Sequence, residues 1–117
     1  MTPDVRAPHQ IVENARRFIL ANLGKPLNTT KVAKGIGVSV EDLTGSYQCA
    51  TPTSFERDLI KIRMNALYES IRMDPTREIT EHISSVGLWN PIETATKFEE
   101  EFWITLDDHQ HNCLGLN

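Results

Sequence analysis

Residues 33–47, AKGIGVSVEDLTGSY, decide the fold, because residues 83–98, ISSVGLWNPIETATKF, repeat their pattern. In each stretch a glycine, Gly37 or Gly87, separates two segments whose apolar residues recur at helical spacing. A residue type that caps helix N-termini, serine in one stretch and asparagine in the other, follows the glycine closely. A helix, a glycine-bearing turn and a second helix form a helix-turn-helix, so the sequence predicts two such units.

The segment between the two repeats is predicted to be one long helix over residues 54–72. Its apolar residues form two stripes, which indicates burial on more than one side and suits a helix that joins two small units. Asp74 and Pro75 end the pattern, because a residue before proline avoids the helical conformation. The two stripes consist of Phe55, Leu59, Ile62, Ala66 and Met73, and of Ile60, Met64, Leu67 and Ile71.

The remaining segments complete an all-α domain. Residues 10–53 are predicted to form the first unit and residues 75–110 the second, and no segment shows the alternation typical of a strand. Residues 1–9 carry two prolines and little apolar content, so we expect a linker or flexible N-terminus there, and a flexible tail over residues 111–117. The expected fold is two helix-turn-helix units joined by a long linker helix, with about seven helices in total.

The composition is typical of a globular protein. Of the 117 residues 39% are hydrophobic and 24% charged, which argues against extensive disorder and suffices for one compact domain or two very small ones. No apolar run approaches the roughly 18 residues that span a bilayer, and the N-terminus lacks an apolar signal segment, so we expect a cytoplasmic protein without a membrane partner. Cys49 and Cys113 are too few for a disulfide framework, and we interpret both as reduced thiols.

Charge is divided unevenly along the chain. The net charge of −4 argues against unspecific attraction to nucleic acid. Residues 10–72 hold nine lysines and arginines against six acidic residues, whereas residues 73–117 hold two against nine. The first part, at +3, suits contact with phosphates, and the second, at −7, would be repelled by them unless its carboxylates face away.

Several polar and aromatic residues are expected in or beside the core. We predict that Arg63 forms a buried ion pair that ties the linker helix to one unit, in preference to a phosphate contact, and that His82 is a hydrogen-bonded core histidine. Trp89 is either a plug at the edge of the core or an exposed contact residue. The residues predicted to pack inward at the end of the second unit are Phe98, Phe102, Trp103, Ile104 and Leu106.

The sequence offers little for catalysis or metal binding. A metal site built from His109, His111 and Cys113 is the alternative to a polar chain end, but zinc usually takes four ligands at wider spacing. Asp107 and Asp108 are adjacent near the end of the chain, and there is no glycine-rich phosphate loop or recognisable nucleophile motif. We therefore expect no enzyme, no catalytic residue, no metal and no cofactor.

The layout of residues 10–110 resembles the C-terminal DNA-binding domain of the AraC/XylS family of bacterial transcription regulators, as a divergent member. The resemblance rests on Ala33, Ser39, Leu43 and Tyr47 in the first unit, Arg63-Met64-x-x-Leu67 in the linker, Ile79-x-x-His82-Ile83-x-x-x-Gly87-Leu88 in the second unit, and Phe98-x-x-x-Phe102 near the end. The departures include Pro52 and Trp103 at family glycines, Phe55 and Leu106 at family prolines, and Gly45, Thr96 and Glu99 at usually basic positions.

This resemblance implies that the second helix of each unit enters one of two successive major-groove segments of DNA, where a recognition helix reads base edges from the outward face near its N-terminus. In the first unit Lys31 and Lys34 suit phosphates, while Thr44 and Gln48 can donate to bases and Glu41 can accept from cytosine. The candidate DNA-binding residues are Lys31, Lys34, Val40, Glu41, Thr44, Gly45 and Gln48 in the first unit, and Pro91, Ile92, Ala95, Thr96 and Lys97 in the second.

The expected partner is double-stranded operator DNA, with RNA polymerase as a second candidate. Family members usually carry a sensor domain, so we expect the isolated domain to be monomeric, with dimerisation through that absent domain as the alternative. The acidic second half also leaves open a different function. The same fold could serve as a protein-interaction module with weak or lost DNA binding, contacting RNA polymerase or another regulator.

Overall fold

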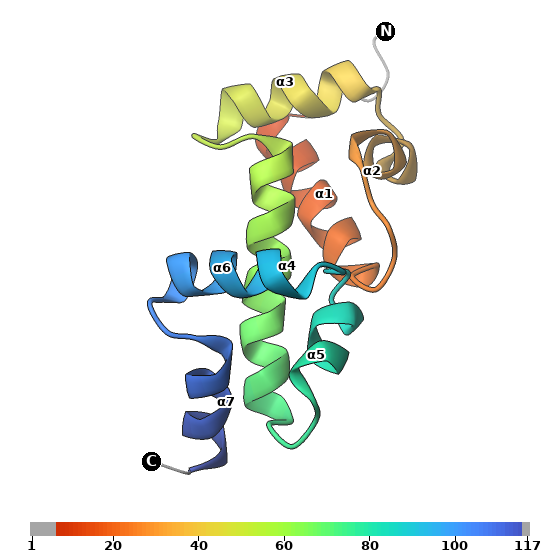
Figure 1. The fold of residues 1–117 in the computed structure, drawn as a ribbon. Helices are drawn as coiled ribbons and strands as arrows, with labels where there is room; N and C mark the ends of the chain where they lie inside the picture. The colour runs from red at the N-terminus through yellow and green to blue at the C-terminus, as the bar shows by residue number, and fades with distance from the viewer. Residues whose placement is uncertain (1–6, 116–117) are drawn as a thin grey trace, which may run out of the picture. The chain divides into compact units, whose positions relative to one another are not determined.

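The computed structural model describes residues 7–115, and the regular elements in that range are seven helices without a strand (Figure 1). This confirms the all-α prediction. In these residues no helix is both long and apolar enough to cross a bilayer. The helices are α1 (Pro8–Ala21), α2 (Thr29–Ile36), α3 (Val40–Ala50), α4 (Phe55–Met73), α5 (Ile79–Ser85), α6 (Pro91–Phe102) and α7 (Leu106–Leu114).

The chain divides into two compact units. In the described residues, unit 1 comprises 7–22 and 26–62, and unit 2 comprises 23–25 and 63–115. The boundary falls inside α4, which is the longest helix at 19 residues and continues unbroken through Ile62. The prediction of one long helix over residues 54–72 is therefore confirmed, and α4 contributes its first half to unit 1 and its second half to unit 2.

The core of unit 1 is an apolar cluster in which α1 packs against both α2 and α3. Figure 1 shows α3 lying across the start of α4, and here the Tyr47 ring meets Phe55 edge-on at a centroid distance of 5.7 Å. The amphipathic pattern of each short helix supplies this core, since the residues at helical spacing are the buried ones. The buried apolar residues of unit 1 are Ile11, Val12, Ala15, Ile19, Val32, Ala33, Leu43, Tyr47 and Phe55.

A polar network is enclosed in the same core. The carboxylate of Asp58, which is 4% exposed, accepts hydrogen bonds from Arg16 Nε at 2.8 Å and from the Tyr47 hydroxyl at 2.6 Å. A buried carboxylate needs such partners, because an unpaired one would be costly to desolvate. Asp58 in turn raises the pKa of Arg16, and burial together with the bond to Asp58 raises the pKa of Tyr47.

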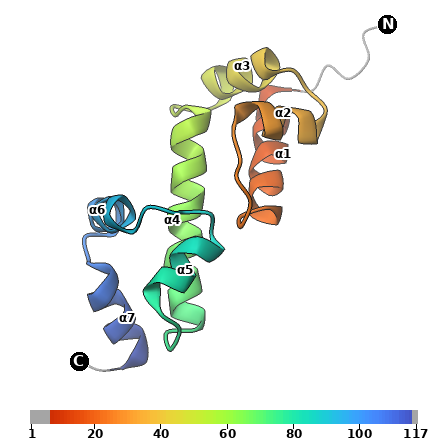
Figure 2. The same cartoon turned by 45° about the vertical axis from the view of Figure 1, so that its right-hand side comes forward.

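Unit 2 is built around aromatic rings. Tyr68 of α4 stacks on His109 of α7 at a centroid distance of 3.9 Å, and it also contacts Phe98 and Phe102 of α6. The His109 Nε2–H donates to the Tyr68 carbonyl at 3.0 Å, so the imidazole is both packed and hydrogen-bonded. Figure 2 shows α5, α6 and α7 arranged about the second half of α4. The inward packing predicted for Phe98 is confirmed, since it is fully buried.

His82 is a satisfied core histidine, as predicted. It is fully buried, and its Nε2–H donates to the Asp74 carbonyl at 2.8 Å while Nδ1 lies 2.7 Å from Ser70 Oγ. The carbonyl can only accept, so Nε2 carries the proton and Nδ1 of the neutral ring can accept from the serine hydroxyl. These bonds fix the end of α4 to α5 within unit 2.

The prediction for Arg63 is half right. Its side chain is buried, but it forms no ion pair within residues 7–115; it donates to the carbonyls of Gly87 at 2.6 Å and Lys25 at 2.8 Å. The guanidinium also lies 5.9 Å from the centre of the Trp89 ring, which is 56% exposed. Arginine presents several donors in a fork, and here two backbone carbonyls take the place of a carboxylate. Burial without a counter-charge lowers the pKa of Arg63.

Three expectations at the chain ends are corrected. Trp103 does not close the core: α6 ends at Phe102, and Trp103 has a left-handed φ of 60° that leaves its side chain 91% exposed. Leu106 is buried as expected. A flexible tail was expected from residue 111, but α7 continues to Leu114, where Gly115 caps it. The first helix begins at Pro8, inside the segment 1–9 expected to be irregular; residues 1–6, 116 and 117 lie outside the described residues.

Candidate nucleic-acid interface

The helix-turn-helix of unit 1 consists of α2, a turn at Gly37, and α3. Asn28 caps α2 by accepting from the Lys31 backbone N–H at 2.8 Å, and Ser39 caps α3 by accepting from the Asp42 N–H at 3.0 Å. Gly37 ends α2 with a φ of 79°, a conformation in which side-chain-bearing residues are strained. The glycine of this turn and the serine that caps the helix after it therefore stand where the sequence predicts them.

The outward face of α3 carries hydrogen-bonding groups on an exposed surface. Val40, Glu41, Thr44 and Gln48 are exposed and Gly45 is half-buried, whereas Leu43 and Tyr47 on the opposite face are buried. A Cβ at Gly45 would meet no atom within 4 Å, so this position is open to a ligand. The structure thus brings all five α3 candidates to one exposed side of the helix, in the positions from which recognition helices read bases.

Two lysines of α2 add positive charge beside this helix. Lys31 and Lys34 are exposed, and neither forms an ion pair in the part of the chain that the structure describes; Lys31 Nζ donates only a long bond of 3.4 Å to the Pro26 carbonyl. Both ammonium groups are therefore free to contact phosphate. Glu41 and Asp42 lie in the first turn of α3, where their negative charge interacts favourably with the positive end of the helix dipole. The same two carboxylates lower the positive charge of the surface near the lysines.

The helix-turn-helix of unit 2 has the same parts in a more crowded setting. Gly87 has a φ of 82°, Asn90 caps α6 by accepting from the Glu93 N–H at 3.0 Å, and Pro91 occupies the first helical turn. A Cβ at Gly87 would lie 2.2 Å from the Leu23 carbonyl oxygen and 2.8 Å from Arg63 Cζ. Packing as well as backbone conformation therefore requires glycine here.

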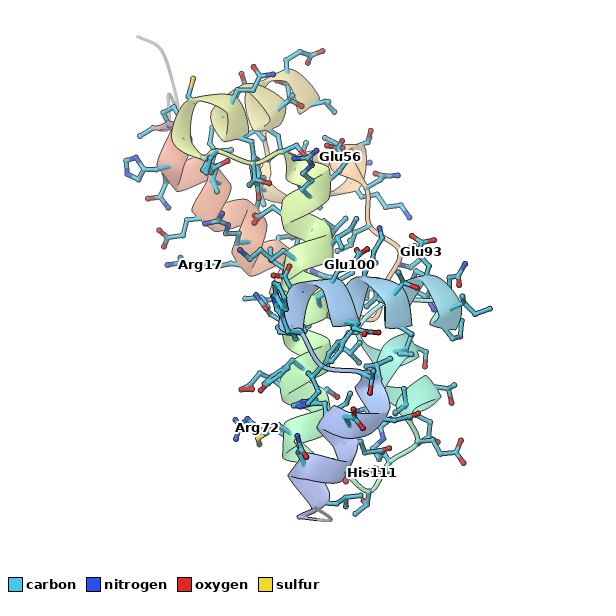
Figure 3. The ribbon with its side chains drawn as sticks, turned by 60° about the vertical axis from the view of Figure 1, so that its left-hand side comes forward. Arg17, Glu56, Arg72, Glu93, Glu100 and His111 are labelled. Atoms are coloured by element: carbon cyan, nitrogen blue, oxygen red, sulfur yellow. The ribbon has the colours of Figure 1, made fainter. Side chains whose placement is uncertain are left out.

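The outward face of α6 differs in charge from that of α3. Pro91, Ile92, Ala95 and Thr96 are exposed as predicted, but Lys97 is half-buried and its Nζ pairs with Glu93 at 3.2 Å. The three consecutive residues Glu99, Glu100 and Glu101 are exposed and have no ion-pair partner within residues 7–115. Figure 3 shows Glu93 and Glu100 on the same side of α6, as their seven-residue spacing requires. This face therefore offers phosphate no free cation.

The two units also divide the charge less sharply than the linear sequence suggests. By sequence, residues 1–22 and 26–62 hold seven basic against six acidic residues, and residues 23–25 and 63–117 hold five against ten. Unit 1 therefore has a net charge of +1 and unit 2 a net charge of −5, so unit 1 is the more positive one, as predicted. The difference is smaller than predicted because Lys25, Arg63 and Arg72 belong to unit 2. Arg63 is buried and Arg72 pairs with Glu69, so neither of these two adds free positive charge to the surface.

The residues considered for a metal do not converge. No group of three His, Cys, Asp or Glu side chains among the described residues could hold a metal ion. His109 is engaged in the core, while His111 is exposed on the same helix. Cys113 Sγ lies 3.8 Å from His109 Nε2, and both cysteines are free thiols.

The exposure of Trp103 was not predicted from the sequence. The available signal was that Trp103 stands at a position where the family usually has glycine.

Three solved structures to which the chain is similar are described as transcription or response regulators or their domains. No family model and no curated protein matches the sequence. A transcriptional regulator from Chromobacterium violaceum, described as one of the AraC-type DNA-binding domain-containing proteins, superposes with a TM-score of 0.80 at 18% identity, over 90% of this chain and 93% of that chain. The chain has the fold of an AraC-type DNA-binding domain.

Two further structures agree. The C-terminal domain of AraT, a response regulator from Geobacillus stearothermophilus, superposes with a TM-score of 0.74 at 24% identity, over 87% of this chain and 84% of that chain. A DNA-binding transcriptional dual regulator from Escherichia coli K-12 gives a TM-score of 0.81 at 16% identity, over 90% and 93% of the two chains. The shared fold is thus retained although few residues are shared.

Proposed function

We propose that this chain is the DNA-binding domain of a bacterial transcription regulator and that unit 1 supplies most of its affinity for DNA. The observation that carries the proposal is the α2–Gly37–α3 motif, whose second helix presents an exposed polar face next to two lysines that have no ion-pair partner in the described part of the chain. The AraC-type fold supports it, because its solved examples are transcription regulators. No catalytic step is proposed; binding and its consequences for transcription are the activity.

Sequence is read by α3 in this proposal. Thr44 and Gln48 donate to or accept from base edges in the major groove, and Glu41 accepts from a cytosine amino group. Val40 supplies an apolar contact at the start of the helix, where a thymine methyl group is the matching feature. Gly45 leaves space for close approach, since nothing stands within 4 Å of its missing side chain.

Phosphate contacts fix the position of α3. Lys31 and Lys34 release counterions when they meet the backbone, which makes the affinity dependent on salt. In unit 2, Pro91, Ile92, Ala95 and Thr96 occupy the corresponding positions of α6, and the contribution of this helix to the affinity for DNA is small because Lys97 is held by Glu93. The domain works as a monomer in the cytoplasm, where its DNA is found.

The test begins with selection of binding sites from a genomic library at low salt, followed by fluorescence anisotropy on the selected duplex. Lys31→Ala with Lys34→Ala should weaken binding to all sequences and reduce the salt slope by about two. Arg57→Ala with Lys61→Ala is the matched control, because these exposed cations of α4 also belong to unit 1 and have no ion-pair partner within residues 7–115.

Sequence reading is tested separately with Thr44→Ala and Gln48→Ala. These variants should lose preference for the selected duplex over a random one while keeping the salt slope, because they remove base contacts and no charge. The proposal fails if no duplex is selected. The assignment to unit 1 fails if the lysine pair is silent while Lys97→Ala abolishes binding.

A further inference from the structure

The outward face of α6 is a stripe with apolar ends and an acidic middle. The members within the helix are four, three and one residues apart, so they share one side of it, and Trp103, which directly follows the helix, lines a hollow together with Thr96, Glu99 and Glu100. The two ends are large apolar side chains that are 82% and 91% exposed, whereas Thr94 and Phe98 on the opposite side are buried. The stripe, which we name the α6 patch, consists of Ile92, Thr96, Glu99, Glu100 and Trp103.

Trp103 is unfavourable in two respects that no contact within the described residues offsets. Its φ of 60° is the only positive value at a non-glycine position in that range, and bulky residues are strained in this conformation. Its ring is exposed to water, and within residues 7–115 only its backbone N–H makes a hydrogen bond, to the Glu99 carbonyl at 2.9 Å. Glycine would suit this backbone and would expose no apolar surface. The indole is therefore available to something outside the chain.

The surface beside the indole has a shape and charge that a partner can use. Thr96, Glu99, Glu100 and Trp103 line an open hollow of about 390 Å³. Neither glutamate has an ion-pair partner in the described residues, and Lys97, the one lysine of α6, is held by Glu93. Carboxylates in the last turns of a helix are also opposed by its dipole, so they gain from an external cation. DNA phosphate would be repelled here.

We propose that the α6 patch docks a basic amphipathic helix of a protein partner. Lysines or arginines of that helix pair with Glu99 and Glu100, and its apolar side chains cover Ile92 and Trp103 at the two ends of the patch. The distance along α6 between these ends is eleven residues, about 16 Å at the helical rise, so a partner helix of about three turns spans it. Charge complementarity selects this occupant over an acidic or a purely apolar one.

The test uses the intact chain and a defined probe. A fluorescently labelled helical peptide of leucine and lysine, with its leucines on one face, is titrated with the protein at moderate salt. Trp103→Gly should weaken binding about tenfold, because a buried aromatic anchor is lost while the charge stays the same and the left-handed backbone is relieved. Glu99→Gln with Glu100→Gln should weaken it by a similar factor and flatten its dependence on salt.

A matched control removes the same charge elsewhere. Glu13→Gln with Glu78→Gln changes two exposed glutamates outside the patch and should alter the affinity by less than about twofold. Trp103→Asn, which also tolerates the left-handed conformation, serves as a second variant if Trp103→Gly shows altered helicity. Circular dichroism establishes that each variant is folded.

Four results would overturn the proposal. One is a Trp103→Gly variant that binds the peptide as tightly as the unchanged chain, and another is equal binding of a serine–lysine peptide of the same charge. The third is a loss of duplex DNA affinity on Trp103→Gly, which would make the patch part of the DNA interface. The fourth is a dimer in sedimentation that depends on Trp103, which would make the occupant a second copy. Loss of DNA binding on changing Lys31 and Lys34 leaves this proposal untouched.

Discussion

Units 1 and 2 use the same local turn but secure it differently. At position 37 only the left-handed backbone conformation requires glycine, because a Cβ there would meet nothing within 4 Å. At position 87 both the left-handed backbone conformation and the lack of space require glycine, because a Cβ there would clash with the Leu23 carbonyl and the Arg63 guanidinium. A turn motif read from sequence can thus be a local feature in one copy and part of a tertiary assembly in the other.

The second helices of the two helix-turn-helix motifs, α3 and α6, also differ in the chemistry of their exposed surfaces. Among the residues that the structure describes, α3 presents polar side chains beside lysines without an ion-pair partner, whereas α6 presents glutamates without one between exposed apolar residues. A repeated fold therefore does not imply a repeated function, since the contacts of each helix depend on residues that the helical pattern does not constrain. The proposed partners differ accordingly: phosphate and bases for unit 1, and a cationic protein partner for unit 2.

The largest expected effect comes from the two glycines. Gly87→Ala should lower the free energy of unfolding by about 2–5 kcal/mol, combining about 1–2 for the left-handed backbone with about 1–3 for overpacking. Gly37→Ala should lose only the backbone share of about 1–2 kcal/mol. Urea denaturation followed by circular dichroism measures both. Equal losses would show that the crowding at Gly87 relaxes at no cost.

A smaller effect is expected from the hydrogen-bonded network around the buried Asp58 carboxylate in unit 1. Tyr47→Phe removes a hydrogen bond to the Asp58 carboxylate and should cost about 1.5–3 kcal/mol at neutral pH. The matched control is Tyr68→Phe of unit 2, because the Tyr68 hydroxyl donates no hydrogen bond within the described residues and its loss should cost much less.

The same network predicts a pH dependence. The pKa of Tyr47 is raised in the folded chain, so the unfolded chain loses this proton first, at about pH 10. The contribution to stability is therefore complete below about pH 10 and is lost as the pH rises further. Tyr47→Phe should reduce this alkaline loss when urea midpoints are compared between pH 8 and pH 11. An unchanged alkaline loss would contradict the raised pKa.

The smallest effect concerns the charge of α6. Glu99→Lys with Glu100→Lys should raise the affinity for random duplex DNA several-fold at low salt, because repulsion of phosphate is replaced by attraction. Glu13→Lys with Glu78→Lys makes the same change in net charge elsewhere and should have less effect in fluorescence anisotropy. If the α6 variant binds DNA no better, its glutamates point away from bound DNA, and the acidic half is no argument against docking of both units.

The sequence alone determined the helices and the two turns. Apolar spacing fixes which residues face inward, and Gly37, Gly87, Ser39 and Asn90 fix where helices end and begin, because capping and left-handed backbone are local properties. For this reason the candidate residues on α3 and α6 were predicted on the outward sides where the structure places them, although their contacts with DNA remain a prediction.

Only the tertiary structure decided the partners of groups that lie far apart in the sequence. Arg63 was expected beside a carboxylate, but it binds the carbonyls of Lys25 and Gly87, and no sequence pattern announces a backbone acceptor. The bond between Tyr47 and Asp58 depends likewise on how α3 meets α4. The apolar ring of Trp103 led to the prediction that it lies in the core, but α6 ends at Phe102 and the left-handed backbone of Trp103 places its side chain on the surface. Helical periodicity reports which side of a helix a residue occupies, and it stops being informative where the helix stops.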